Sequence, residues 1–480
     1  MSRLWTGSEL AKATGAAVSV DGVDGISIDT RSLKPGDLFV ALQDQRDGHD
    51  FVAHALQGGA AAALVARDLP GVAREKLIIV ANPLAALGQL AAAARARSAA
   101  KVVAVTGSVG KTGTKDMLRI IFADQGRVHA AEKSYNNHWG VPLTLARMPR
   151  DTEFAVIELG MNHPGEIAPL ARLARPHVAL ITTVAAVHAG AFETLEAIAD
   201  EKASIFEGLE KGGIAVLPAD NAHFARLSAK ARQHAGDIIS FGGTDGATFR
   251  QLEARPGPTA TVINAHSPDG PFLFKLGAPG LHLAMNALGA LAAAHAAGAD
   301  LARAALALAI WRAPEGRGAR LGIALGPSGM DGQITLIDES YNANPSSMGA
   351  ALDVLTLCPV EDGIGRVAAG RRIAILGDML ELGQDELSLH AALAHHGALE
   401  NITIIHCVGP RMHALYKALP GNKRGQWFEN AQACAAKAAK LLDAGDVVMV
   451  KGSLGAAMRH VVDAIKNLGE CSPLDQSEGA

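Results

Sequence analysis

The sequence predicts an α/β protein of three domains: a small N-terminal α/β module, a central, mostly parallel doubly wound sheet, and a C-terminal Rossmann-like sheet. Two observations support this prediction. Apolar strand patterns alternate with helical patterns along the chain, and its 480 residues exceed what one hydrophobic core normally organises. Composition and polar stretches place the boundaries near residues 97 and 314, so we expect domains 1–97, 98–314 and 315–480.

The composition is that of a soluble globular protein, with 49% hydrophobic residues, 19% charged residues and a formal net charge of −4. Because this charge gives no basic field, we expect no nucleic-acid partner. The four cysteines form no C-x-x-C pair, which suits a reducing cytoplasm. The apolar stretch from Leu281 to Trp311 is broken by Asp300 and Arg303, which indicates buried helices without membrane insertion. We expect a cytoplasmic monomer.

In the first domain, strand patterns at residues 26–29 and 37–42 flank a Pro-Gly turn, and further strands are expected at 62–66 and 77–80. Asp29-Thr30-Arg31 and Gly48-His49-Asp50 are polar clusters at the ends of these elements. Such clusters often contact ligands. Polarity of an ordinary surface loop explains them equally well on pattern alone.

The strongest functional signal is KVVAVTGSVGKTGTKD, from Lys101 to Asp116. An apolar strand that ends in a glycine-rich turn before a helix can hold phosphates on backbone N–H groups, while the lysine reaches the β- and γ-phosphates and the threonine holds Mg²⁺. The first glycine is Gly107, so the loop is a compact variant of the usual spacing. An ordinary strand-to-helix turn is disfavoured because strand, glycines, Lys-Thr and helix coincide. The predicted ATP-binding loop is Gly107, Ser108, Val109, Gly110, Lys111, Thr112 and Gly113.

Two side chains follow later strands of the central domain, Glu158 after residues 152–157 and His188 after residues 178–184. Ligands of open parallel sheets bind beyond the carboxyl ends of the strands, so both are metal candidates beside the loop. Glu158 suits Mg²⁺ better, and a purely structural His188 is equally plausible. The Asn286 amide suits an adenine edge, although a helix-capping role fits equally well.

The third domain shows strand patterns at residues 333–338, 372–376, 402–408 and 446–450, and the last three lead to glycine-containing turns. No G-x-G-x-x-G follows them, which argues against a dinucleotide domain. Asn344 before Pro345 predicts a helix N-cap followed by proline at the first helical position. The polar tail after Cys471 is expected to be disordered.

The compact loop, with Glu158, His188, Asn286 and Arg317, resembles the Mur ligase family. The segments 134–137, 158–162, 338–345 and 377–383 are similar to the branch that adds D-alanyl-D-alanine to UDP-N-acetylmuramoyl-tripeptide. The Asp-Asn-Pro-Arg signature of the relative that adds diaminopimelate or lysine is absent. Glu339 stands where the family often has a second aspartate. The resemblance covers nearly the whole chain.

This resemblance implies a UDP-substrate-binding domain, an ATP-binding domain and a ligase domain that delivers the dipeptide. It implies that ATP, with Mg²⁺, converts the tripeptide carboxylate to an acyl phosphate, which the amine of D-alanyl-D-alanine attacks. The expected product is a peptidoglycan precursor.

The resemblance also implies roles for individual residues. Catalytic roles fall on Lys111, Lys202 and His188, and metal binding on Thr112, Glu158, His188 and Lys202. Further ATP contacts fall on Asn286, Arg317 and Asp338, the last two from the third domain. Substrate binding falls on Ser27, Thr30, Arg31, Asn136, Asn137, Asn342 and Asn344.

Lys202 on its own is best interpreted as a solvated helix lysine. The resemblance aligns it with a lysine that is carbamylated in several family members. A carbamate carries two oxygens and a negative charge, so it acts as a hard metal ligand like a carboxylate.

Two alternative functions remain. One is another ligase of the superfamily, either a Mur ligase adding a single amino acid or a folylpolyglutamate synthase, although the N-terminal module argues against the folate enzyme. The other is a P-loop switch that gates a protein partner, which leaves that module and the segment 377–383 unexplained. A requirement of ATP turnover for a small acceptor would separate the ligases from the switch.

Overall fold

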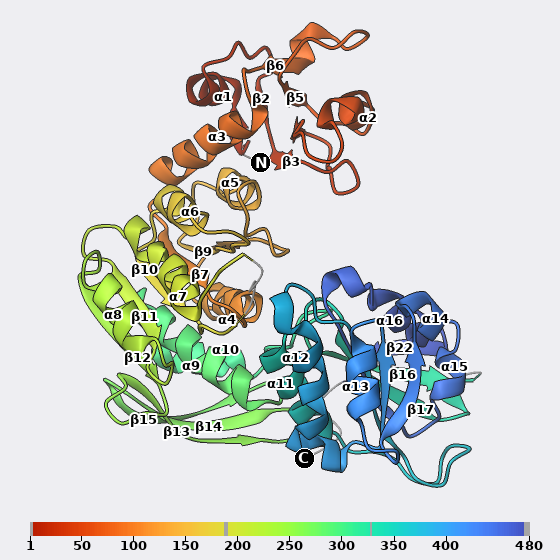
Figure 1. Cartoon of the computed structure of the whole chain (residues 1–480). Helices are drawn as coiled ribbons and strands as arrows, with labels where there is room; N and C mark the ends of the chain where they lie inside the picture. The colour runs from red at the N-terminus through yellow and green to blue at the C-terminus, as the bar shows by residue number, and fades with distance from the viewer. Residues whose placement is uncertain (1–2, 187–190, 327–328, 475–480) are drawn as a thin grey trace.

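The computed structural model describes residues 3–186, 191–326 and 329–474. It contains three main sheets, one in each part of the chain, and Figure 1 shows the N-terminal module above two larger α/β units that lie side by side. This arrangement is the α/β fold with parallel sheet domains that the sequence predicts.

The N-terminal module is a four-stranded parallel sheet in the order β3-β4-β5-β6, with a short β1-β2 ribbon beside it. Thr6 caps its first helix through a capping box with Glu9, and a left-handed Gly15 ends that helix. Its elements are β1 (Trp5–Thr6), α1 (Gly7–Thr14), β2 (Gly22–Val23), β3 (Gly25–Ser27), β4 (Asp37–Val40), η1 (Gly48–Phe51), α2 (Val52–Gln57), β5 (Ala62–Val65), η2 (Arg74–Lys76), β6 (Leu77–Ile79) and α3 (Pro83–Arg97).

The central sheet has nine strands in the order β15-β14-β13-β12-β11-β10-β7-β9-β8, and only β14 and β15 are antiparallel to their neighbours. Its strands are β7 (Lys101–Thr106), β8 (Val128–Ala130), β9 (Phe154–Glu158), β10 (Val178–Ile181), β11 (Ile214–Pro218), β12 (Asp237–Gly242), β13 (Phe249–Pro256), β14 (Thr261–Ser267) and β15 (Gly270–Leu276). Its helices are α4 (Lys111–Ala123), α5 (Gly140–Ala146), α6 (Ile167–Ala174), α7 (Leu195–Ala203), η3 (Ser204–Gly208), α8 (Phe224–Ala231), α9 (Leu281–Ala296) and α10 (Leu301–Leu308).

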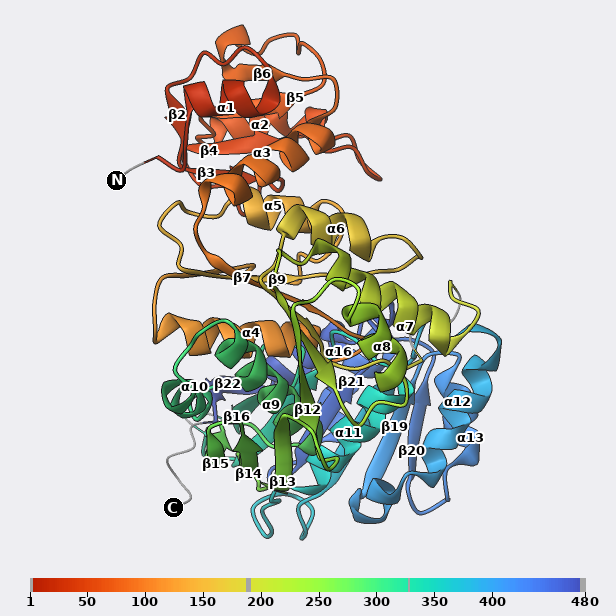
Figure 2. The same ribbon diagram turned by 90° about the vertical axis from the view of Figure 1, so that its left-hand side faces the viewer.

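Helices cover both faces of this sheet, as Figure 2 shows. The helices α4, α9 and α10 pack on one face, while α5, α6, α7 and α8 pack on the other. The alanine-rich stretch from Leu281 to Trp311 forms the buried helices predicted from the sequence. Within the described part of the chain, no helix has the length and apolar character needed to cross a bilayer.

The N-terminal module shares a core with the central unit. Helix α3 packs on α5, and Leu143 and Ala146 of α5 belong to the hydrophobic cluster of the module. The Trp5 indole N–H donates to the Ala146 carbonyl at 2.9 Å. This shared core fixes the module against one end of the central sheet.

The third sheet has seven strands in the order β20-β19-β18-β21-β17-β16-β22, of which β16 and β22 are antiparallel to their neighbours. Its strands are β16 (Ala319–Leu325), β17 (Gln333–Glu339), β18 (Arg372–Gly377), β19 (Ile404–Val408), β20 (Arg424–Phe428), β21 (Val447–Lys451) and β22 (Gly469–Pro473). Its helices are α11 (Pro345–Thr356), η5 (Gly383–Asp385), α12 (Glu386–Ala392), η6 (Leu393–His395), η7 (Gly397–Asn401), α13 (Met412–Ala418), α14 (Ala431–Ala435), α15 (Ala438–Leu441), η8 (Leu454–Ala456) and α16 (Arg459–Lys466).

The expected disorder directly after Cys471 is wrong, because Cys471, Ser472 and Pro473 pair with β16. Backbone ladder bonds hold this polar edge strand, so apolar alternation is not required. At the start of α11, Asn344 caps the helix and Pro345 occupies its first turn, as predicted.

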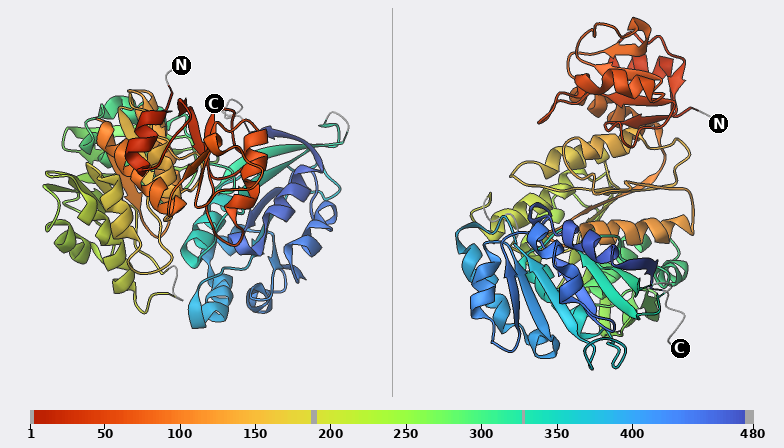
Figure 3. Two further views of the ribbon diagram at one scale, coloured as in Figure 1. Left: turned by 90° about the horizontal axis from the view of Figure 1, so that it is seen from above. Right: turned by 90° about the vertical axis from the view of Figure 1, so that its right-hand side faces the viewer.

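The linker between the two larger units is anchored to α4 at one end and contains two glycines at the other. Trp311 is buried and its indole N–H donates to Asp116 Oδ2 of α4 at 3.1 Å. Gly316 and Gly318 follow with φ values of 75° and 107°, in the region that favours glycine. The linker thus turns sharply and brings the third sheet beside the central one (Figure 3).

Candidate active site

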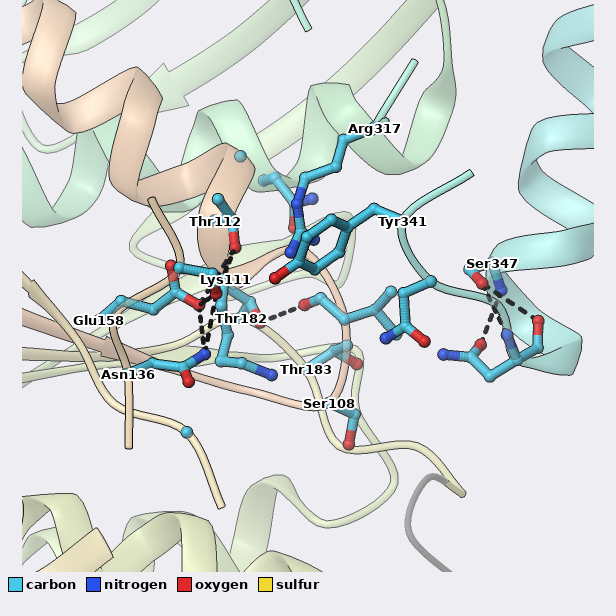
Figure 4. A pocket seen from close by; sticks show the side chains of 18 of the residues that line it. Ser108, Lys111, Thr112, Asn136, Glu158, Thr182, Thr183, Arg317, Tyr341 and Ser347 are labelled. Atoms are coloured by element: carbon cyan, nitrogen blue, oxygen red, sulfur yellow. Dashed lines mark hydrogen bonds between the residues drawn. The ribbon is translucent and has the colours of Figure 1, made fainter. Parts of the chain in front are cut away.

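A cavity of about 850 Å³ lies between the central and third units. Residues that follow the carboxyl ends of β7, β9, β17 and β21 line it, together with the first residues of α4, α9 and α11. Figure 4 shows the side chains of Lys111, Thr112, Asn136 and Glu158 facing Arg317 and Tyr341 across this cavity. The site therefore forms where the carboxyl ends of the strands of two sheets face each other.

The loop between β7 and α4 requires its glycines. A Cβ atom at Gly107 would lie 1.9 Å from Thr182 Oγ1, and one at Gly110 would lie 2.5 Å from the amide nitrogen of Asn286. Both glycines also have positive φ values. Lys111 opens α4, and its Nζ donates to the Gly107 carbonyl at 2.7 Å. The lysine thus curls over the loop, where enclosure by protein lowers the pKa of its ammonium group.

Glu158 lies at the end of β9, beside the loop, and is 1% exposed. Its Oε1 accepts hydrogen bonds from Thr112 Oγ1 at 3.1 Å, Ser134 Oγ at 2.9 Å and Asn136 Nδ2 at 2.7 Å. Its Oε2 is buried and accepts no hydrogen bond from the described residues. A buried carboxylate oxygen without a donor has the chemistry of a cation ligand.

This carboxylate provides the test for a metal. Within residues 3–186, 191–326 and 329–474, no three His, Cys, Asp or Glu side chains gather to form a site made of protein ligands alone. Mg²⁺ commonly takes one or two carboxylates and completes its shell with water and substrate phosphates. Glu158 and the Thr112 hydroxyl fit that donor set. His188, the other predicted ligand, lies outside the described residues.

Lys202 lies on α7 and is 1% exposed, so its interpretation as a solvated lysine is wrong. The side chain points into the protein, where Nζ lies 3.9 Å from Met161 Sδ. Burial, with a smaller effect from the charge of Lys111, lowers the pKa of Lys202 well below its usual value. Lys202 does not line the cavity, although its contact Met161 does.

Asn286 lies in the second turn of α9, so the predicted helix-capping alternative is wrong. The N-cap position belongs to Gly280, and the Asn286 amide abuts Gly110 of the loop and lines the cavity. The amide is therefore placed to form hydrogen bonds with a ligand held by the loop.

The third unit contributes a second wall. The Arg317 guanidinium lies 4.2 Å from the centre of the Tyr341 ring, and both side chains line the cavity. Asp338 does not line it: Oδ2 accepts the Gly316 N–H at 3.1 Å, and Oδ1 accepts both donors of Ser340. This buried carboxylate therefore holds the backbone that carries Arg317.

The predicted substrate residues fall into two groups. Asn136, Asn137, Asn342 and Asn344 line the cavity. Ser27, the last residue of β3, and Thr30 and Arg31, which follow β3 in the N-terminal module, do not line it. The Arg31 guanidinium, which pairs with Asp29, lowers the pKa of that carboxyl group.

The loop of residues 131–139 connects these two groups. Tyr135 in this loop stacks under Arg147, whose Nε donates to the Ile26 carbonyl of the module at 2.6 Å. The same loop brings Ser134 and Asn136 to Glu158. A substrate long enough to cross this loop would reach both groups.

Two supporting residues were missed as site residues. Ser134 contacts Glu158, as described above, and Lys115 is 3% exposed with Nζ 2.6 Å from the Ala131 carbonyl. The sequence signal for Lys115 is its spacing: it lies four residues after Lys111 on α4, so both side chains are on the same face of the helix. Lys111 and Lys115 are two enclosed amines within electrostatic reach of Glu158, and Lys202 is a third enclosed amine within reach of Lys111. This excess of enclosed amines favours a polyanionic ligand.

The fold and this cavity define a nucleotide-dependent enzyme of three α/β domains. Three family models match the chain: the "Mur ligase family, catalytic domain" over residues 22–95, the "Mur ligase middle domain" over 105–294 and the "Mur ligase, glutamate ligase domain" over 328–454.

Named relatives narrow the family. The UDP-N-acetylmuramoyl-tripeptide--D-alanyl-D-alanine ligase of Escherichia coli (strain K12) is 36% identical over 456 residues, which cover 94% of this chain and 95% of the relative. A crystal structure of MurF from Acinetobacter baumannii has a TM-score of 0.81 at 29% identity and covers 96% of this chain and 99% of its own. MurF from Thermotoga maritima in complex with ADP shares the fold, with a TM-score of 0.72 at 24% identity over 92% and 97% of the two chains. The chain belongs to the Mur ligase family, in the group that contains the MurF enzymes. It is an ATP-dependent ligase.

Proposed function

We propose that this enzyme joins D-alanyl-D-alanine to UDP-N-acetylmuramoyl-tripeptide at the expense of ATP, as a step of peptidoglycan precursor synthesis. The names of its relatives supply the substrates. The observation that supports the chemistry is the half-satisfied carboxylate of Glu158 beside the glycine loop, among enclosed lysines. This arrangement suits a nucleotide triphosphate and its cation.

The first step would transfer a phosphoryl group. An oxygen of the tripeptide carboxylate attacks the γ-phosphorus of ATP, and the bond to the β,γ-bridging oxygen breaks as ADP leaves with its electron pair. Lys111 is placed to exchange the Gly107 carbonyl for phosphoryl oxygens, and Arg317 can approach from the opposite wall. Such transfer depends on positioning and charge neutralisation more than on covalent chemistry by the protein.

Glu158 and Thr112 are the residues that would hold Mg²⁺, because Oε2 of the carboxylate lacks a donor and the hydroxyl is adjacent. The cation would supply charge neutralisation at the phosphate oxygens. We infer that Ser134 and Asn136 orient the carboxylate, since both donate to its Oε1.

The second step would form the amide. The amine nitrogen of the dipeptide attacks the acyl carbon, the carbon–oxygen bond to phosphate breaks, and phosphate leaves with that electron pair. Water would hydrolyse the acyl phosphate, so the two walls of the cavity must exclude it. The sharp linker at Gly316 and Gly318 supports such closure of the third domain.

We assign the uridine nucleotide to domain 1–97, ATP to domain 98–314 and dipeptide delivery to domain 315–480. Ser27, Thr30 and Arg31 would contact the nucleotide end of the substrate, while Asn136 and Asn137 would contact its peptide end. Asn342 and Asn344, on the third domain, would contact the dipeptide. The loop of residues 131–139 supports this division, because its Asn136 donates to Glu158 and its Tyr135 packs against the core of the N-terminal module. A catalytic role of His188 stays a prediction.

Lys202 is proposed as a carbamate. Its lowered pKa favours the neutral amine, which is the form that adds carbon dioxide. Among the described residues its Nζ has a weak acceptor as its hydrogen-bond partner, Met161 Sδ at 3.9 Å, so a buried amine there is poorly stabilised. A carbonyl-carbon signal after exposure to ¹³C-labelled carbon dioxide would test this proposal.

The direct test of the function is product mass. Wild-type protein with ATP, Mg²⁺, UDP-N-acetylmuramoyl-tripeptide and D-alanyl-D-alanine should yield the tripeptide substrate plus one dipeptide less water, with ADP and phosphate. Single amino acids and folyl substrates serve as competing acceptors and donors. A product with either, and none with the dipeptide, would overturn the proposal. ATP turnover without any acceptor would favour the switch. We also propose a cytoplasmic monomer, which size-exclusion chromatography tests in part.

A further inference from the structure

The proposed reaction leaves one proton without a destination. An α-amino group has a pKa near 8, so at neutral pH the dipeptide arrives mainly as an ammonium ion, which cannot attack a carbon atom. A ligase of this kind therefore gains from a group that binds the ammonium ion and another that accepts its proton. The question is which side chains of the cavity offer these two properties.

Most carboxylates around the cavity are already engaged by backbone donors. Glu166 accepts the Asn162 N–H at 2.6 Å, and Asp220 accepts the Gly243 N–H at 2.6 Å. Asp338 accepts hydrogen bonds from Gly316 and Ser340, as described above. Glu158 lies with the phosphate-binding loop. This leaves Glu339, which lines the cavity at the end of β17.

Glu339 has one oxygen engaged and one available. Its Oε2 accepts a hydrogen bond from Lys451 Nζ at 2.9 Å, and Lys451 also donates to the Asn342 carbonyl at 3.0 Å. Its Oε1 accepts no hydrogen bond within the described part of the chain, and it lies toward Gly318 of the linker loop, where a Cβ would be 3.2 Å away. The buried Lys451 fixes the carboxylate, so its available oxygen is held in place.

His282 faces the same space from the other domain, as the second residue of α9. The His282 side chain is exposed to the cavity, where its partial removal from bulk water by the surrounding protein lowers the pKa of the imidazole. The charged groups that act on it are Glu339, which raises this pKa, Lys451, which lowers it, and Asp353 of α11, which raises it. A lowered pKa favours the neutral imidazole, which is the form that can accept a proton.

His282 also stands where two cavities meet. A side cavity of about 630 Å³ adjoins the main one, and His282, Ser346 and Ala350 line both. The start of α9 and the outer face of α11 form the walls of the side cavity. A proton accepted by His282 thus has a path to solvent that avoids the phosphate site.

We propose that Glu339 and His282 form the acceptor-amine site, in which Glu339 binds the ammonium group of the incoming dipeptide and His282 accepts its proton. This inference rests on the proposed ligase function. The N–H bond breaks with its electron pair left on nitrogen, and that pair forms the new bond to the acyl carbon as phosphate leaves. One residue belongs to the central domain and the other to the third, so domain closure assembles the site.

Hydroxylamine provides the discriminating experiment, because it is largely unprotonated at neutral pH and traps an acyl phosphate without needing a base. Glu339→Gln and His282→Asn should form the hydroxamate of the tripeptide substrate within about twofold of wild type. With D-alanyl-D-alanine at pH 7, both should lose about 100-fold in kcat/KM. The loss should shrink as pH rises past the pKa of the amine. Glu339→Gln should mainly raise KM for the dipeptide, and His282→Asn should mainly lower kcat.

The matched control is Glu400→Gln, which removes an exposed carboxylate of the third unit that lines neither cavity and does not act on the pKa of His282, and it should keep wild-type dipeptide kinetics. Equal losses with hydroxylamine and dipeptide, or a dipeptide loss that is the same at every pH, would overturn the proposal. If one variant fails to fold, the other carries the same test. A wild-type protein that forms neither hydroxamate nor ADP would instead overturn the ligase function itself.

Discussion

The two sheets that meet at the cavity differ in how far their charged side chains are paired with other protein groups. At the carboxyl ends of the central strands, no carboxylate of the described residues is in hydrogen-bond contact with Lys111 or Lys202, and one Glu158 oxygen has no donor among the same residues. At the carboxyl ends of the strands of the third sheet, Lys451 is paired with Glu339. Asp338 there accepts hydrogen bonds from Gly316 and Ser340.

This difference indicates a division of labour. Uncompensated charge in an enclosed site is costly without a ligand of opposite charge, so the central edge is built for a polyanion and a cation. Paired charges cost less and hold their geometry, so the third edge is built to position groups. The predictions below test each side of this contrast, in order of expected effect.

The largest effect is expected for Lys111→Met. The substitution removes the cation that would stabilise the transferring phosphoryl oxygens, so kcat should fall by about 1,000-fold or more. Thermal stability should be unchanged or higher, because an enclosed ammonium group is replaced by an apolar chain of similar size. Kinetics of ADP release and a thermal melt measure the two quantities.

Lys101→Met is the control for this prediction, because Lys101 is exposed at the start of the same strand, β7. It should keep wild-type kinetics. A Lys111→Met enzyme with a rate near wild type would remove the assignment of the loop.

The second effect concerns Lys202→Ala. If the carbamate occupies a metal position, this variant should lose most activity, about 100-fold, and millimolar acetate should restore part of it by filling the vacated space. Lys211→Ala is the control, at an exposed lysine of the same domain. It should keep wild-type activity, and acetate should not change that activity. Full activity of Lys202→Ala, or a loss that acetate never relieves while the protein stays folded, would contradict the carbamate.

The sequence predicted the central edge far better than the third. The glycine loop and Glu158 are local signals, since parallel pairing places Glu158 opposite Val105 just before the loop. Burial of Lys202 was not predictable from residues 199–204, because a polar helix segment does not reveal which of its faces packs inward. The resemblance, and not the pattern, indicated this lysine.

Long-range contacts limited the remaining predictions. The antiparallel extension formed by β13, β14 and β15 alternates polar and apolar residues, yet its pairing with the parallel sheet depends on neighbours outside the segment. The role of Asp338 could not be read either. The resemblance implied an ATP contact, whereas two backbone N–H groups and a hydroxyl donate to this carboxylate. A sequence shows that a carboxylate is present, but not which donors of the folded protein already bind it.

The third effect is on stability and lies within the third domain. Burial lowers the pKa of His406 to about 4, against about 6.5 in the unfolded chain. Between these values the unfolded state binds more protons, so the free energy of unfolding falls as pH drops from about 6.5 to 4. At pH 5 the loss should be about 2 kcal/mol relative to pH 7.

His406→Asn should remove this dependence, because the amide oxygen can accept the Gln426 N–H that now donates to Nδ1. Melting temperatures at pH 7 and pH 5 give the comparison, with His54→Asn, at an exposed position of α2, as the control. The same pH sensitivity in wild type and His406→Asn would show that His406 is not the group that titrates.

The smallest effect tests how the two sheets are coupled, through Trp311. Its indole N–H donates to Asp116 of α4, the helix that begins at the phosphate loop, while Asp116 keeps a second partner in Arg119. Trp311→Phe should therefore cost about 1 kcal/mol for the hydrogen bond, and further stability for the space left at this buried site. Trp427→Phe removes a comparable hydrogen bond, from its indole N–H to the Gly409 carbonyl at 2.9 Å, but this side chain is 38% exposed and lies away from the linker. Trp427→Phe should therefore lose less stability, and only Trp311→Phe should raise KM for ATP, by a few-fold, since it alone loosens the tie between the linker and α4. Equal KM values in the two variants would mean that the linker is held by packing of the Trp311 ring, and that the contrast between the two edges does not depend on this hydrogen bond.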